Sequence, residues 1–177
     1  MNRLSMVFAL TVVMCVIQMN IGCAGTVHHA VAVMRPTQGN NVQGFVTFTE
    51  NKGQVIVAAE ILGLTPNARH AIHIHELGDA RHPGGKSAGG HYNPEGHAHA
   101  LPDTPTRHAG DLGNLQTNQN GSAKYHVSVK NISINGRKNP ILGRSVIIHE
   151  KTDDGGQPTG NAGPRIAIGV IGIAKPN

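Results

Sequence analysis

Short apolar runs with alternating polar positions recur along the chain from about residue 27 onward, and glycine, proline, asparagine or aspartate separates them. An alternation of period two is typical of β-strands, and no run has the length and periodicity of a helix. The pattern predicts strands at 27–34, 42–49, 54–62, 71–75, 112–117, 123–129, 145–149 and 167–173. Eight strands of this spacing predict one all-β domain, an immunoglobulin-like Greek-key β-sandwich or flattened barrel with long loops.

The N-terminus has a different pattern. Arg3 precedes an apolar run, 6–17, that is too short to cross a bilayer as a helix, and the two together predict a signal peptide over residues 1–22. The Gly22-Cys23 pair resembles a bacterial lipoprotein cleavage site, although Asn20 stands where that pattern prefers an aliphatic residue. Lipid anchoring at Cys23 and free secretion therefore both stay open. We expect export to the periplasm or the extracellular space, without a membrane span.

The charge distribution of the chain bears on whether it binds nucleic acid. Lysine and arginine exceed aspartate and glutamate by 15 to 10, a net charge of +5, but the excess is scattered. No basic block with interleaved aromatic residues occurs, which argues against nucleic-acid binding.

Histidines at strand spacing indicate a metal site. His73 and His75 alternate with isoleucine, so both should lie on one face of a strand and form half of a site. His149 ends another apolar run and could supply a third nitrogen. The glycine- and proline-rich loop between these runs carries three imidazoles and a carboxylate, a set that suits tetrahedral zinc: His91, His99, His108 and Asp111. Imidazole ligands alone suit copper, zinc, iron or nickel, so the residues do not name the metal.

Five segments around these residues resemble the copper/zinc superoxide dismutases, in particular exported members of the bacterial type. They are 73–79, 87–94, 107–114, 149–154 and 159–174, and they occur in the family's order within a domain spanning 27–174. The resemblance implies an enzyme that disproportionates superoxide to dioxygen and hydrogen peroxide, with copper as the redox centre and zinc in a structural role.

The resemblance also implies which residues hold each metal. Copper would be bound by His73, His75, His91 and His149. Zinc would be bound by His91, His99, His108 and Asp111. The shared ring, His91, would bridge as an imidazolate, which requires a cation on each side near neutral pH.

Two further residues and one proton step follow from the resemblance. Asp153 would accept hydrogen bonds from one histidine of each site and fix their orientation. Arg165 would lie beside the copper channel and attract the anionic substrate, because its guanidinium stays protonated. His91 would supply a proton as it detaches from copper.

The sequence departs from the family's pattern in three places. The usual intrasubunit disulfide positions carry Gly85 and Ile168, and the two cysteines, Cys15 and Cys23, precede the domain. Such a crosslink contributes about 2 to 4 kcal/mol, so we expect zinc to hold the loop and the metal-free form to be labile. The segment 153–159 is several residues short, which predicts a more open site. His97 could replace His99 as a ligand, although the family's spacing favours His99.

A non-catalytic copper/zinc-binding or copper-storage domain is the alternative. Asp153 and Arg165 argue against it, because metal binding alone requires neither. A homodimer is a further expectation, without an assigned surface. The remaining histidines have no counterpart in the resemblance, and we expect ordinary surface or core residues at His28, His29, His70, His82 and His126.

Overall fold

The computed structural model describes residues 26–176. The predicted signal peptide, 1–22, and the candidate lipidation site, Cys23, lie outside these residues. Within them, one short 3-10 helix, η1 (Lys86–Ala88), accompanies eight strands. The strands are β1 (His29–Pro36), β2 (Gln43–Asn51), β3 (Gln54–Leu62), β4 (Arg69–His75), β5 (Asp111–Gln116), β6 (Ala123–Val129), β7 (Ser145–His149) and β8 (Arg165–Ile173).

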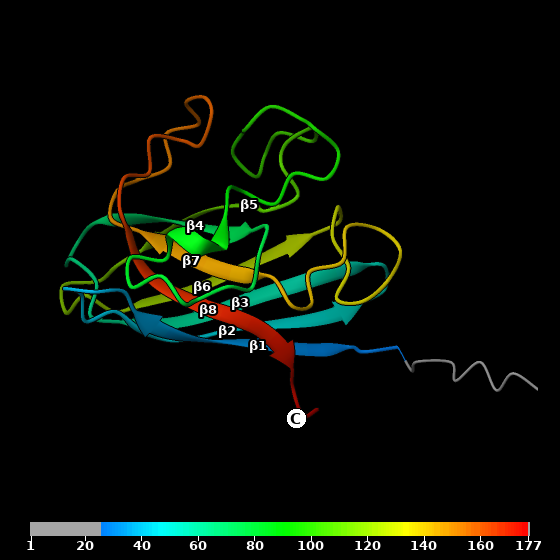
Figure 1. The fold of residues 1–177 in the computed structure, drawn as a ribbon, viewed down its shortest axis with the longest axis horizontal. Helices are drawn as coiled ribbons and strands as arrows, with labels where there is room; N and C mark the ends of the chain where they lie inside the picture. The colour runs from blue at the N-terminus through cyan, green and yellow to red at the C-terminus, as the bar shows by residue number, and fades with distance from the viewer. Residues whose placement is uncertain (1–25, 177) are drawn as a thin grey trace, which may run out of the picture.

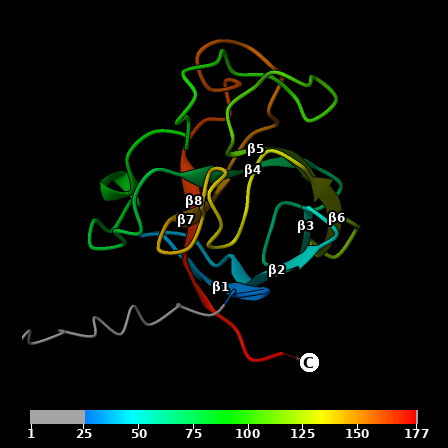
Figure 2. The same cartoon turned by 90° about the vertical axis from the view of Figure 1, so that its right-hand side faces the viewer.

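The strands pair antiparallel in the order β5-β4-β7-β8-β1-β2-β3-β6. β8 pairs with β7 on one side and with β1 on the other, so it joins the two halves of the sheet. The sheet curls into a nearly closed barrel (Figure 2). At the seam between the end strands β5 and β6, the Tyr125 hydroxyl donates a hydrogen bond to the Leu112 carbonyl. The predicted all-β Greek-key fold is therefore confirmed.

Alternation along the strands decides which residues enter the core. In β3, every second residue from Val55 to Ile61 is buried inside the barrel, and Val55, Val57 and Ile61 are fully buried, while the residues that alternate with these positions are not. Burial of each such side chain contributes about 1.5 to 3 kcal/mol to stability. β7 and nearly all of β4 are instead buried on both faces, because loops cover their outer side. In β4, Ile72 and Ile74 pack in the core, and the histidines that alternate with them, His73 and His75, lie under these loops.

Two long loops position the residues outside the barrel. The loop 76–110 joins β4 to β5, and the loop 150–164 joins β7 to β8. Both extend from the same side of the barrel, drawn in green and in orange in Figures 1 and 2. No helix within residues 26–176 has the length and hydropathy to cross a membrane.

Candidate metal centre

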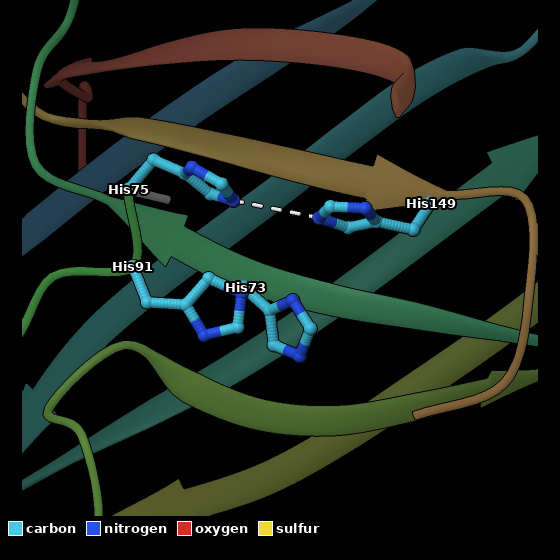
Figure 3. Close-up of side chains that lie close together, drawn as sticks. All are labelled: His73, His75, His91 and His149. Atoms are coloured by element: carbon cyan, nitrogen blue, oxygen red, sulfur yellow. Dashed lines mark hydrogen bonds between the residues drawn. The ribbon is translucent and has the colours of Figure 1, made fainter. Parts of the chain in front are cut away.

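Four histidines converge where β4 and β7 meet the loops. His73 and His75 come from β4, His149 ends β7, and His91 comes from the loop 76–110 (Figure 3). Antiparallel pairing places His73 opposite Ile147, two residues before His149. All four rings are buried, and one nitrogen of each lies within 4.8 Å of those of the others. The structure thus brings together the four residues that the resemblance gave to copper.

Backbone contacts hold His91 against the end of β4. It forms an isolated antiparallel bridge with His75, and the Tyr92 amide donates to the Ile74 carbonyl at 2.9 Å. The Ile74 amide in turn donates to the Gly110 carbonyl at 2.9 Å. A Cβ at Gly110 would lie 2.1 Å from the Ile74 carbonyl oxygen, so the loop can approach this closely only with glycine there.

The ring hydrogen bonds leave lone pairs facing one another. Nδ1 of His75 donates to the Gly89 carbonyl at 3.0 Å, and Nδ1 of His149 donates to the Gly163 carbonyl at 3.0 Å. In a neutral ring, the other nitrogen then carries only a lone pair. The Nε2 atoms of these two histidines lie 3.4 Å apart, along the dashed line in Figure 3. Two lone pairs at this separation need a positive charge between them.

A proton is a poor candidate for that charge. Burial lowers the pKa of His73 to about 4 and that of His149 to about 3. Burial, with the nearby His91 ring, also holds the pKa of His75 well below its ordinary value. These rings are therefore neutral near pH 7, which is the state in which imidazole binds metal ions. The donor set fits a metal ion.

A second set surrounds Asp111, the first residue of β5. Its Oδ1 lies 3.0 Å from Nδ1 of His91, 3.0 Å from Nδ1 of His99 and 3.3 Å from Nδ1 of His108. Tetrahedral zinc with ligands at 2.0 to 2.1 Å separates its ligand atoms by about 3.3 Å. The spacing and the donor set of three nitrogens and one oxygen therefore fit zinc.

Charge in this second set also favours a cation. Burial opposes ionisation of Asp111, but hydrogen bonds from His91 and His99 hold its pKa below the ordinary value. For His99, burial acts to lower the pKa, yet the bonds to Asp111 and Asp153 outweigh it and raise the pKa to about 9. In metal-free protein a proton on His99 therefore takes the place of the metal's charge.

His91 takes part in both sets. Its Nδ1 faces Asp111, whereas its Nε2 is buried and has no hydrogen-bond partner among residues 26–176. Nδ1 of His73 is likewise buried without a hydrogen bond. Buried polar atoms in folded proteins are nearly always paired, and a metal ion in the first set would satisfy these two nitrogens.

Asp153 links the two sets. Its Oδ2 accepts from Nε2 of His73 and its Oδ1 accepts from Nε2 of His99, both at 2.9 Å. Each bond fixes the tautomer that leaves Nδ1 free for a metal. The backbone of Asp153 is held in turn by the Asn114 side chain, through bonds of 2.7 and 2.9 Å. A Cβ at Gly160, where φ is +73°, would lie 2.0 Å from Oδ1 of Asp153.

Arg165, the first residue of β8, reaches across to the loop 76–110. Its Nη1 and Nη2 donate to the carbonyls of Gly85 and Gly89, both at 2.6 Å. The Gly89 carbonyl is also the acceptor for His75, so this oxygen connects the arginine to a histidine of the first set. Burial lowers the pKa of Arg165, but a guanidinium remains protonated near neutral pH.

Gly85 and Ile168, which stand where the family usually has its disulfide cysteines, lie in the same region. Ile168 packs with Ala88 and Ile147 in a small buried cluster beside the main core. Together with the two bonds from Arg165, this cluster attaches the loop 76–110 to β8.

Sequence reasoning gave no role to three residues that support the ligands. The Gln157 side chain accepts from the amide of His99 at 3.2 Å and donates to its carbonyl at 2.7 Å, so the short segment 153–159 still reaches the second set. His70, almost fully buried, donates from Nδ1 to the His149 carbonyl at 3.0 Å. Asn114 lies in a segment of the resemblance, which was the one signal available for it.

The remaining histidines stand apart from both sets. His97 is partly exposed, 3.5 Å from Glu95, and belongs to neither set, whereas His99 is buried in the second. The rings of His28, His82 and His126 are exposed.

Comparisons with known proteins point to one family. A family model described as copper/zinc superoxide dismutase (SODC) matches residues 42–171. The superoxide dismutase [Cu-Zn] of Paramecium bursaria Chlorella virus 1 is 46% identical over 143 residues, which are 77% of this chain and 75% of that protein. The enzyme of the same name from Humicola lutea is 44% identical over 154 residues, 82% of this chain and 98% of that protein. The crystal structure of the clock protein EA4 superposes with a TM-score of 0.78 at 39% identity, covering 85% of this chain and 97% of that one.

Proposed function

The chain belongs to the copper/zinc superoxide dismutase family, and from this and the two ligand sets we infer that it disproportionates superoxide. Two superoxide anions and two protons would yield one dioxygen and one hydrogen peroxide. The observation that carries the proposal is the His91 ring, whose two nitrogens face two different ligand sets.

We assign copper to His73, His75, His91 and His149, and zinc to His91, His99, His108 and Asp111. When bound, copper supplies a centre that takes one electron from superoxide and returns it to the next, and zinc supplies charge without redox chemistry. The all-nitrogen set supports copper and the carboxylate-containing set supports zinc, because zinc accepts oxygen ligands in tetrahedral sites.

The residues of the chain then have separate tasks. His91 holds the proton that peroxide formation needs at Nε2, the nitrogen without a hydrogen-bond partner among the described residues. Asp153 keeps His73 and His99 in the tautomers that bind metal. Arg165 attracts the anion, because its guanidinium is partly exposed and lies beside His75 through the shared Gly89 carbonyl.

We also propose export through the leader 1–22, with either a lipid anchor at Cys23 or free release into the periplasm or medium. Its apolar run behind Arg3 supports this. A homodimer is proposed as well, since Val33 on β1 and Val170 on β8 are large apolar side chains exposed on neighbouring strands. Light scattering of the protein without its leader tests the dimer, and mass analysis of the native N-terminus tests the anchor.

The decisive experiment measures superoxide consumption by protein that lacks residues 1–22, loaded with copper and zinc, with metal content determined on the same sample. We expect consumption close to the diffusional limit when both metals are present. Protein that retains both metals but shows no turnover would favour copper storage instead.

A further inference from the structure

A positively charged cavity lies outside the metal centre, beyond the end of β6. Its volume is about 320 Å³, and it lies between the loop 76–110 and the segment that follows β6. Three of its lining side chains are cationic and none is a carboxylate; the polar and charged ones are Arg107, Ser128, Lys130, Asn131 and Lys138.

Arg107 is a fixed part of this cavity. The residue is only 8% exposed, and its Nε donates to the Asp111 carbonyl at 3.2 Å while Nη1 donates to the Thr104 carbonyl at 3.1 Å. Nη2 has no hydrogen-bond partner among residues 26–176. The guanidinium is thus held in one orientation with donors left for a ligand. Burial lowers its pKa, yet the group stays protonated near neutral pH.

The two lysines lack a compensating charge. Neither Lys130 nor Lys138 forms an ion pair within the described part of the chain. Two carboxylates act electrostatically on Arg107, namely Asp111 and Asp103. Asp111 belongs to the zinc-type set, and Asp103 lines the neighbouring cavity rather than this one. Three cations around one cavity repel one another, and an anion between them would relieve that repulsion.

We propose that this cavity binds a tetrahedral oxyanion, a phosphate group, through Arg107, Lys130 and Lys138. A guanidinium with free donors and two ammonium groups would form charge-assisted hydrogen bonds to its oxygens. The hydroxyl of Ser128 adds a neutral donor at the same wall. The cavity is larger than a single phosphate ion, so a phosphate monoester also fits by volume.

Occupancy of the cavity should stabilise the zinc-type set. Arg107 directly precedes His108 and bonds to the carbonyl of Asp111, so an anion that fixes the guanidinium also fixes the backbone between two proposed zinc ligands. By linkage, phosphate should therefore raise the thermal unfolding midpoint of the metal-loaded protein.

The test is calorimetric titration of the metal-loaded protein with inorganic phosphate at constant ionic strength. We expect saturable binding at one site in the wild type. In the double variant K130A/K138A the affinity for phosphate should be lower by about tenfold or more, because two charge-assisted bonds are lost. The matched control, K124A/K175A, removes the same charge. Lys124 lies six residues before Lys130, about 20 Å away along an extended chain, so this control should bind as the wild type does.

Two further titrations locate the site and identify the source of the phosphate. Arg165→Gln should retain phosphate binding, because Arg165 lies at the metal centre. Glycerol phosphate that binds more tightly than the inorganic ion would identify a monoester as the ligand, and equal affinities would identify the free ion. The proposal is overturned by an absence of saturable binding in the wild type, by equal weakening in both lysine pairs, or by loss of binding in Arg165→Gln.

Discussion

Replacing Asp153 by asparagine should weaken metal binding at the two ligand sets while the barrel stays folded. The carboxylate accepts one hydrogen bond from His73 and one from His99. An amide of the same shape accepts at its single oxygen, so one of the rings meets an NH₂ group instead. The NH₂ group donates to Nε2 of that ring and so favours the tautomer with the proton on Nδ1, the nitrogen that faces the metal position.

The size of the effect follows from the bonds that change. A hydrogen bond to a charged partner contributes about 1.5 to 3 kcal/mol, and one of two such bonds is lost. The side chain of Asp153 is fully buried, so solvent does not screen the loss. At about 1.4 kcal/mol for each factor of ten, metal affinity should fall roughly 10- to 150-fold.

Competition with chelators of known affinity measures this change for zinc and copper separately. The matched control is Asp154→Asn, which alters an exposed neighbour whose carboxylate bonds the Asn161 side chain and the Gly156 amide. Wild-type affinity for both metals in Asp153→Asn, or the same loss in the control, would refute the reasoning.

Three other predictions concern the same centre. Arg165→Ala should lower superoxide consumption about tenfold or more through lost steering with copper content unchanged, whereas His149→Ala should lose both; equal copper loss in the two would contradict the assigned roles. Zinc binding near pH 7 should release about one proton, because the pKa of His99 is raised to about 9 in metal-free protein; zinc affinity should therefore increase with pH up to about 9. Calorimetry in two buffers of different ionisation enthalpy measures the proton, and identical heats would contradict its release. Gly160→Ala should reduce zinc content and the unfolding midpoint, because its Cβ would meet a buried carboxylate, whereas Gly39→Ala, with φ +83° and open space, should keep its zinc.

The strands could be predicted because each depends on a local pattern. The alternation of isoleucine with His73 and His75 gave both the strand and the shared face of the two rings. Boundaries were less exact, since β8 begins at Arg165, two residues before the predicted start. Arg165 pairs with His149 across an irregularity in the register, and that pairing depends on another strand rather than on the residues near Arg165.

The supporting residues could not be predicted from local patterns. Gln157 contacts His99 only because two loops fold back over the same face of the barrel. His70 and His73 lie in the same strand, but the His70 ring donates a hydrogen bond to the backbone of β7 and belongs to neither ligand set. His70 was left without a role because it has no counterpart in the resemblance, and its hydrogen-bond partner depends on the pairing of β4 with β7.

The Gly89 carbonyl oxygen accepts hydrogen bonds from both His75 and Arg165. One atom of a loop therefore sets the angle of a proposed copper ligand and the reach of the side chain proposed to draw in the substrate. Any shift of that loop moves both at once, so ligand geometry and anion capture cannot be retuned separately. Substitutions near this oxygen should alter redox potential and encounter rate as a correlated pair.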